Sequence, residues 1–344
     1  MTVGKPALVV EGASTADGCT TLTAADPTKD SIVTGGSFGF SLTNNNILLS
    51  GFVVQNSAIG IQTSDAFSGY RITDNVAQND TTAGVNFNSG GGSQSRVDHN
   101  CLRSNSGDGG LESEIGNLKN ALIDHNTTFQ NLNNGIDLSG SGQRAYVTVT
   151  NNSSIKDAGS SFTMDNSIGS SIDHNTSQHD PGTTGGPITI GGANNSLNVS
   201  YNTVQAGGNG IVFNPNTFFP VFPAPNQGLT VNGNTISQTL GSGIVATPNS
   251  VTLSLFSGNA VSLTGIDGIR IQSGNNNNRI ENNHSDQNNH DGIRNEVGAT
   301  GNTYLSNSMF LNVTFDAEDG NRTANTWSGN HCNTDFPPGT ICGV

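Results

Sequence analysis

The chain has 344 residues, of which 32% are hydrophobic and 11% charged, and its formal net charge is −14. These proportions exclude a helical bundle and a disordered tail. An acidic chain without a basic stripe also lacks the electrostatic feature of a nucleic-acid binder. No apolar run reaches the roughly 20 residues that cross a bilayer, so we expect neither a nucleic-acid partner nor a membrane span.

The chain enters directly at a predicted strand over residues 6–10, with no secretory signal peptide after Met1. We interpret this beginning as a trimmed mature form. The 45 glycines and the many asparagines are spread along the whole length, which favours many short strands separated by turns.

Two short signals recur along the chain. The first has the form apolar-x-x-Asn, and the intervals between its copies from Asn75 to Asn234 are 25, 26, 26, 23, 27 and 32 residues. The second is a glycine followed by an apolar residue. The first signal occurs at residues 72–75, 97–100, 123–126, 149–152, 172–175, 199–202, 231–234 and 280–283, and the second at residues 60–61, 84–85, 135–136, 210–211, 243–244, 268–269 and 292–293.

A period near 25 residues with short strands and Asn/Gly turns predicts an all-β fold, a right-handed parallel β-helix of about 11–13 coils. The leucine pattern of leucine-rich repeats and the 3.6-residue period of helical repeats are both missing. Coils would stack about 4.8 Å apart, and the Asn column would form a hydrogen-bonded ladder. Asn126, Asn152 and Asn175 begin glycosylation sequons, yet a glycan would prevent stacking, which favours a bacterial protein.

We expect a single domain over residues 1–344 with two special segments. The Pro/aromatic stretch around Phe218 and Phe219 predicts a projecting loop at 217–227, which either builds a binding site or covers apolar surface. Cys332 and Cys342 predict a disulfide-closed tail at 323–344 and an oxidising compartment. Cys19 and Cys101 either pair through a loop that crosses several coils or remain buried thiols.

The repeat resembles the pectin-lyase-like superfamily of right-handed β-helices over essentially the whole chain, and residues 325–332 look like the terminal segment of bacterial β-helix repeat proteins. The segment at 97–100, with Asp98 and His99, followed by Asp108 and Glu112, is similar to the pectate lyase pattern. That family has an Asp-His dipeptide and then two acids, four residues apart, that bind Ca²⁺. The resemblance implies Asp108 and Glu112 as this pair, although the family's catalytic Arg motif is not found after Asn126.

Strand alternation predicts which side chains leave the sheet. If the apolar residue of each Gly-apolar pair points inward, an acidic cluster faces outward on three consecutive coils: Glu112, Glu114, Asp137 and Asp165. Like charges at this spacing repel, so the cluster should bind a cation or hold a proton; a solvated charged face is the alternative. Lys119 and Arg144 follow Glu112 and Asp137 by seven residues each and are expected to stack one coil apart beside the cluster.

A second outward patch is expected near the C-terminus, beside His290 and Asp291. It would be an ion-pair ladder or a grip for anionic substrate groups. Its members are Arg270, Arg294, Glu296, Asp316 and Glu318.

Three functions fit these features in a secreted or cell-surface protein. A Ca²⁺-assisted polysaccharide lyase would bind the ion through Asp108, Glu112, Glu114 and Asp137, and Lys119 or Arg144 would remove the sugar C5 proton. A glycoside hydrolase would use two of the carboxylates, Asp137 and Asp165 among them. A non-catalytic carbohydrate-binding protein is the third. Substrate contacts are expected from Arg270, Arg294, Phe218 and Phe219; the oligomeric state stays open.

Overall fold

The computed structural model describes residues 1–13, 18–21, 24–180, 182, 185–215 and 224–343. Within them the chain forms strands, turns and bends but no helix, and hence no helix that could cross a membrane. It is a parallel β-solenoid of about 11 turns with about 25 residues in each, which confirms the expected fold class. Two compact units make up the chain: Met1–Met164 with Gly169–Ser171, and Asp165–Ile168 with Ile172–Val344.

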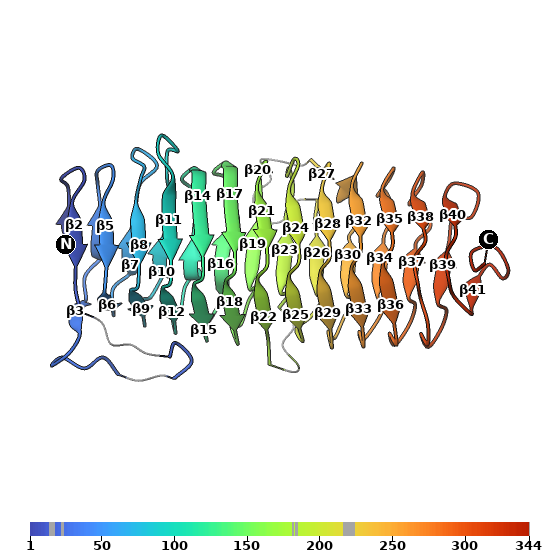
Figure 1. Ribbon diagram of the computed structural model, residues 1–344, viewed down its shortest axis with the longest axis horizontal. Coiled ribbons are helices and arrows are strands. Elements are labelled where there is room, and N and C mark those ends of the chain that lie inside the picture. Colours follow the sequence, from blue (N-terminus) through green and yellow to red (C-terminus); the bar gives the residue numbers. More distant parts are fainter. Residues whose placement is uncertain (14–17, 22–23, 181, 183–184, 216–223, 344) are drawn as a thin grey trace. The chain divides into compact units, whose positions relative to one another are not determined.

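In the first unit each coil contributes strands to three parallel sheets (Figure 1). The first sheet contains β1 (Thr2–Val3), β4 (Phe38–Leu42), β7 (Ile59–Gln62), β10 (Ala83–Asn86), β13 (Gly109–Glu112), β16 (Asn134–Leu138) and β19 (Phe162–Met164). The second contains β2 (Val9–Glu11), β5 (Leu48–Ser50), β8 (Arg71–Thr73), β11 (Ser95–Asp98), β14 (Leu118–Asp124) and β17 (Arg144–Thr150). The third contains β3 (Ser31–Thr34), β6 (Phe52–Gln55), β9 (Val76–Gln78), β12 (Cys101–Arg103), β15 (Thr127–Phe129) and β18 (Ser153–Ile155).

The second unit repeats this arrangement. Its first sheet contains β23 (Ile188–Ile190), β26 (Ile211–Phe213), β30 (Ile244–Ala246), β34 (Ile269–Ile271), β37 (Ile293–Asn295), β39 (Ala317–Asp319) and β41 (Asp335–Phe336). Its second contains β21 (Ser171–Asp173), β24 (Asn198–Ser200), β28 (Thr230–Asn232), β32 (Leu255–Ser257), β35 (Arg279–Glu281), β38 (Thr303–Leu305) and β40 (Thr326–Ser328). The third contains β22 (Thr176–Gln178), β25 (Thr203–Gln205), β29 (Thr235–Ser237), β33 (Ala260–Ser262) and β36 (His284–Asp286), and three short strands are β20 (Ser167–Ile168), β27 (Asn226–Gln227) and β31 (Val251–Thr252).

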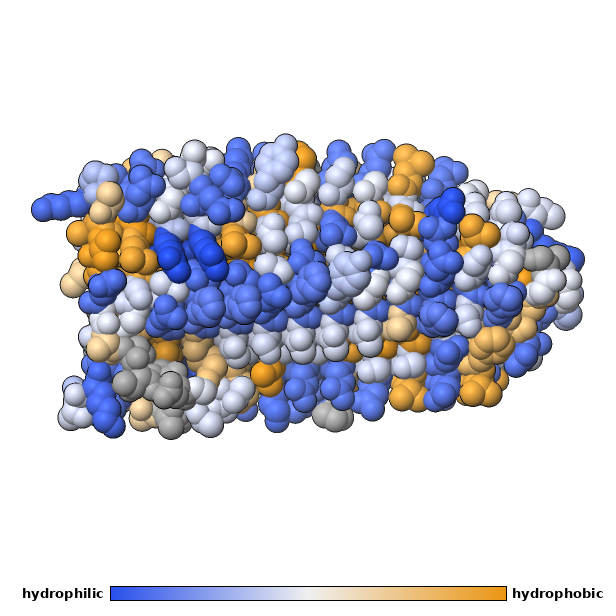
Figure 2. Space-filling view, in the orientation of Figure 1, coloured by the Kyte–Doolittle hydropathy of each residue, from blue (hydrophilic) through white to orange (hydrophobic). Residues whose placement is uncertain are grey.

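The apolar residues of the Gly-apolar signal form the core. Val85 pairs in register with Leu111, and Leu111 with Ile136, and all three are buried. The preceding glycine is required because a Cβ on Gly84 would lie 2.7 Å from a carbonyl oxygen of the next coil. The face shown in Figure 2, in contrast, is covered largely by hydrophilic residues.

The predicted Asn ladder is present in each unit. In the first, the Nδ2 of Asn100 donates to the Oδ1 of Asn126 at 2.9 Å, and Asn126 donates to Asn152 at 3.0 Å. Each amide also donates to backbone carbonyls, so that it satisfies polar groups that the bend would otherwise bury unpaired. Because Asn126, Asn152 and Asn175 are buried in ladders, their sequons are closed to glycosylation.

The residue before each ladder asparagine has a positive φ angle. The angle is 56° at Asp74, 56° at His99, 53° at His125 and 54° at Asn151. Asp, Asn and His adopt this left-handed conformation more readily than most residues. The bend turns these side chains outward, where they form a row with one member on each coil.

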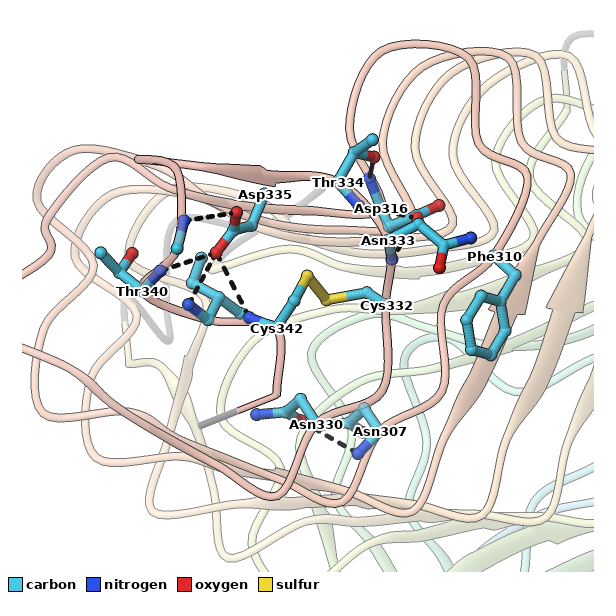
Figure 3. The surroundings of a disulfide bond; sticks show 12 residues. Asn307, Phe310, Asp316, Asn330, Cys332, Asn333, Thr334, Asp335, Thr340 and Cys342 are labelled. Atoms are coloured by element: carbon cyan, nitrogen blue, oxygen red, sulfur yellow. Dashed lines mark hydrogen bonds between the residues drawn. A yellow bond between two sulfur atoms is a disulfide. The ribbon is translucent and has the colours of Figure 1, made fainter.

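Both disulfides are present. Cys332 pairs with Cys342 as predicted (Figure 3). Cys19 pairs with Cys101, with Cα atoms 5.3 Å apart, which decides between the two alternatives left by the sequence. The expected loop at 217–227, including Phe218 and Phe219, lies mostly outside the described residues.

We expect the substitution Asn126→Ala to lower the free energy of unfolding by about 2–4 kcal/mol, because it leaves several buried ladder partners unsatisfied. Urea unfolding followed by circular dichroism measures the effect. The matched control is Asn133→Ala, at an exposed turn residue. Equal midpoints for the two variants would show that the ladder adds nothing to stability.

Candidate functional site

The acidic residues of the first unit lie on neighbouring strands of its first sheet. Glu112 of β13 pairs with Asn86 of β10 and with Asp137 of β16, and Asp137 pairs with Thr163 of β19. Because Leu111 and Ile136 point into the core, strand alternation directs Glu112 and Asp137 to the outer face. They are nevertheless only 3% and 4% exposed, which indicates that neighbouring side chains and corner segments enclose them.

Three carboxylates converge at this place. Asp108, Glu112 and Glu114 each offer an oxygen atom, and these oxygens lie within 4.8 Å of one another. Asn86 donates a hydrogen bond of 2.6 Å to Glu112. We call Asp108, Glu112, Glu114 and Asp137 the acidic cluster.

The acidic cluster holds a proton at neutral pH. Burial and the neighbouring carboxyl group of Asp108 raise the pKa of Glu112 to about 8. Burial, with the charges of Asp108 and Asp137, also raises the pKa of Glu114. A carboxyl group that is protonated at pH 7 can donate a proton, whereas a cation bound among the same oxygens would displace it.

Asp137 is held by specific hydrogen bonds. It accepts from the amide of Asn134, from the hydroxyl of Thr163 and, at 3.0 Å, from the backbone N–H of Ser139. These contacts fix its carboxylate beside Glu112 in the register. Asp165 belongs to the second unit, so its expected place in the cluster remains a prediction.

The expected stacking of Lys119 on Arg144 is wrong. Arg144 pairs with Leu118, and Lys119 pairs with Ala145. Six residues separate Glu112 from Leu118, but seven separate Asp137 from Arg144. The additional residue in the second corner changes the face of the strand on which Arg144 lies.

Arg144 is therefore an interior residue with no exposed surface. Its guanidinium group donates to the carbonyl oxygens of Ser139 at 2.6 Å, Gly140 at 3.2 Å and Glu114 at 3.4 Å, and also to that of Gly142. It positions the corner segments that border the acidic cluster, and its positive charge lowers the pKa of Glu114 against the other effects. A guanidinium enclosed in this way is not available as a base.

The second patch is an ion-pair network on β34, β37 and β39. Arg270 binds Glu296 at 2.5 Å, and Arg294 binds Glu318 at 3.3 Å. Asp316 does not join it, because its carboxylate accepts backbone N–H groups of Asn333 and Thr334 (Figure 3). Arg270 and Arg294 remain predicted substrate contacts.

Sequence reasoning missed one member of this patch, Asp267. His290 Nδ1 lies 2.8 Å from Asp267 and 3.0 Å from Asp291, both fully buried. Burial and a hydrogen bond with Glu318 raise the pKa of Asp291 to about 7. The signal was the tetrapeptide Asp-Gly-Ile-Arg, which occurs at 267–270 and again at 291–294.

Two groups of side chains among the described residues thus have a metal-ligand arrangement: Asp108, Glu112 and Glu114 of the acidic cluster, without Asp137, and the group of Asp267, His290 and Asp291. Around His290, Arg270 Nε is 3.6 Å from Asp267, and Arg294 Nε is 4.0 Å from Asp291. These fixed cations oppose a metal ion. The oxygen donors of the acidic cluster are the type that Ca²⁺ prefers, so the acidic cluster is the better cation site.

We expect the unfolding midpoint of Glu112→Gln to exceed that of the wild type by an amount that grows from pH 5 to pH 8. The raised pKa of Glu112 means that its stabilising contribution is complete below the usual glutamate pKa and is lost as the pH rises toward 8. Glutamine imitates the protonated form at every pH.

Thermal unfolding at several pH values tests this prediction. The exposed Glu11 provides the control Glu11→Gln, which should change the midpoint little. A constant difference between Glu112→Gln and the wild type would contradict the proposed proton.

No protein-family profile matches the sequence, and no curated protein matches it either. The structure is similar to DFA-IIIase from Arthrobacter chlorophenolicus A6 in complex with GF2, with 14% identity, a TM-score of 0.52, and coverage of 94% of this chain and 84% of that chain. The mannuronan C-5 epimerase AlgE6 A-module of Azotobacter vinelandii matches with 14% identity, a TM-score of 0.49, and coverage of 88% and 91%. The similarity to DFA-IIIase and the parallel pairing of the coils show that the chain has the right-handed parallel β-helix fold.

Proposed function

We propose that the chain is a secreted carbohydrate-active enzyme that hydrolyses a polysaccharide at the acidic cluster, with Glu112 as the proton donor. The observation that carries the proposal is the convergence of Asp108, Glu112 and Glu114 in a partly enclosed place on the outer face. Hydrolysis of a glycosidic bond requires one carboxylic acid and one carboxylate.

Glu112 meets the requirement for the acid. Its pKa of about 8 keeps it protonated at pH 7, and a protonated carboxyl group can transfer its proton to the oxygen that leaves the sugar. The hydrogen bond from Asn86 orients the side chain. Asp108 supports the protonated state through its own charge.

Asp137 is the proposed second carboxylate, as nucleophile or as the base that activates water. It occupies the position next to Glu112 on the adjacent strand. Neighbouring strands lie about 4.8 Å apart, close to the about 5 Å between the two carboxyl groups of retaining glycosidases. Asn134 and Thr163 hold it in place.

Charge argues for a neutral polymer as the substrate. The net charge is −14, and Arg144, whose positive charge acts on Glu114, is buried and donates to backbone carbonyl groups. A polyanion would be repelled from such a face unless a cation intervened. The two disulfides fit an extracellular location.

A Ca²⁺-assisted lyase is the second candidate, since the three convergent carboxylates also suit a hard cation. In that reaction the ion would bridge to a uronate carboxylate. The proposed base would then be Lys119, because Arg144 is interior. Lys119 lies on β14, in a different sheet from Glu112, which makes this candidate the weaker one.

We expect Glu112→Gln to lower the kcat for polysaccharide cleavage by about 10²–10⁴-fold, because an amide cannot protonate the leaving oxygen. Asp137→Asn should have a similar effect. Glu281→Gln, which removes a carboxylate paired with Arg279 in the second unit, serves as the control. Full activity of the Glu112→Gln variant would show that Glu112 is not the proton donor.

We also expect cleavage of a neutral glycan to release reducing ends without absorbance at ultraviolet wavelengths, and to survive chelation. Reducing-sugar assays and absorbance, run in parallel on neutral glycans, pectate and alginate with and without chelator, provide the measurement. Unsaturated ends that disappear on chelation would instead establish the lyase. Binding without cleavage of any polymer would indicate a scaffold protein.

A further inference from the structure

The outward row at the ladder bends brings two histidines together in the first unit. His99 follows β11 and His125 follows β14, at equivalent bends on adjacent coils. Their rings are stacked, with centroids 5.1 Å apart and an angle of 3° between the planes. Their side chains are 52% and 53% exposed, so both rings are accessible from solvent.

Each ring is oriented by its own aspartate. His99 Nδ1 lies 3.0 Å from Asp98, and His125 Nδ1 lies 2.7 Å from Asp124. With Nδ1 used as the donor to a carboxylate, Nε2 of the neutral ring carries the free lone pair. Across the part of the chain that the structure describes, neither Nε2 atom makes a hydrogen bond.

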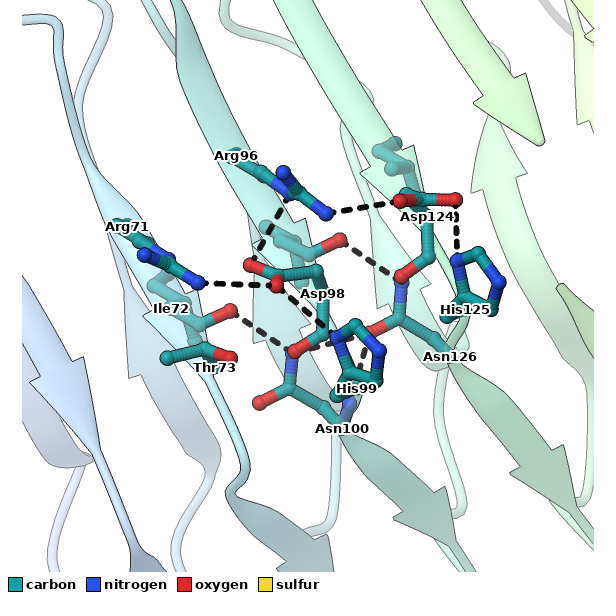
Figure 4. Close-up of polar contacts among 12 residues, drawn as sticks. Arg71, Ile72, Thr73, Arg96, Asp98, His99, Asn100, Asp124, His125 and Asn126 are labelled. Carbon is teal, nitrogen blue, oxygen red and sulfur yellow. Dashed lines mark hydrogen bonds and ion pairs between the residues drawn. The ribbon is translucent and has the colours of Figure 1, made fainter. Parts of the chain in front are cut away.

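The aspartates are themselves fixed. Arg71 binds Asp98 at 3.5 Å, and Arg96 binds Asp124 at 2.9 Å. Figure 4 shows the guanidinium groups on one side of the carboxylates and the imidazole rings on another. The arginines therefore hold the aspartates without occupying the space in front of the two Nε2 atoms.

We propose that His99 and His125 form a binding site for a divalent transition-metal ion of the Zn²⁺ or Cu²⁺ type. Imidazole nitrogen suits these ions. A histidine that binds a metal almost always donates its other ring N–H to a carboxylate, which sets the tautomer and the ring orientation. The two Asp–His pairs already have this arrangement before any ion is bound.

Zinc–nitrogen bonds of about 2.0–2.1 Å bring two ligand nitrogens within about 4 Å of each other. The stacked rings must therefore tilt toward each other on binding, which their exposure permits. Water completes the coordination. The site is independent of the acidic cluster, whose carboxylate oxygens favour hard cations instead.

The chain contains its own control. His174 also has an aspartate on Nδ1, with Asp173 at 3.0 Å, but its ring stacks on Tyr201 with centroids 5.0 Å apart. His174 thus has the supporting aspartate but no second imidazole beside it. The proposed site differs from it in having two histidines on adjacent coils.

The test is calorimetric titration of tag-free, full-length protein with Zn²⁺ near pH 7.5, with Cu²⁺ electron paramagnetic resonance as a second readout. We expect one tight site whose Cu²⁺ spectrum shows two nitrogen ligands. His99→Gln and His125→Gln should each abolish the tight site. Asp124→Asn should weaken it by about 10–100-fold, whereas His174→Gln should leave it unchanged.

Three results would overturn the proposal: no tight site in the wild type, unchanged binding in His99→Gln, or equal loss in His174→Gln. Circular dichroism of each variant checks that the fold is retained. Because exposed histidines are replaced by glutamine, the ladder asparagines beside them keep their hydrogen bonds. Ca²⁺ binding that persists in both His99→Gln and His125→Gln would belong to the acidic cluster. The histidine substitutions therefore distinguish the proposed transition-metal site from a Ca²⁺ site at that cluster.

Discussion

Parallel pairing in register between successive coils is the constraint on which the rest of the structure depends. It places equivalent residues of successive coils one strand apart, at about 4.8 Å. A side chain on one coil therefore lies beside its counterpart on the next coil. The buried asparagines maintain it, because each amide both accepts from one neighbouring coil and donates to the other. A glycine before each core-facing residue permits the close approach of the next coil, and the apolar residue after the glycine fills the core.

The same spacing has different chemical consequences on different faces. Glu112 lies beside Asp137 at this spacing, and it retains a proton because burial and the carboxyl groups of Asp108 and Glu114 on its own coil raise its pKa. Alternating charges relieve the same repulsion by pairing, as Arg270 and Arg294 do with glutamates of following coils. Imidazoles at this spacing stack and present their nitrogens in parallel.

The chemistry of each row depends on how far neighbouring groups enclose it. Glu112 points outward from its sheet but has little exposed surface, and burial is the first cause of its raised pKa. His99 and His125 stay open because the bend carries them away from the coil. One row is therefore suited to proton transfer in a partly enclosed place, and the other to an ion that arrives from solvent.

Local patterning was sufficient to predict the solenoid, the Asn ladder and the alternation that directs Glu112 and Asp137 outward. These features recur along much of the described chain, so a residue's neighbours follow from its distance to the next copy. Arg144 shows where the pattern ends. One additional residue in the corner between Asp137 and Arg144 places the Arg144 side chain in the interior. The length of a corner does not follow the repeat, so the sequence pattern does not predict it.

The sequence by itself determined the period, the fold class and the identity of the residues in each row, because these depend on local spacing. Only the tertiary structure decided the pairing of Cys19 with Cys101, the inward turn of Arg144 and the attachment of Asp316 to the terminal segment. Each depends on the path of an irregular segment between coils. The physical reason is that strands have a fixed rise and pleat, whereas a loop can reach the same end point in many conformations.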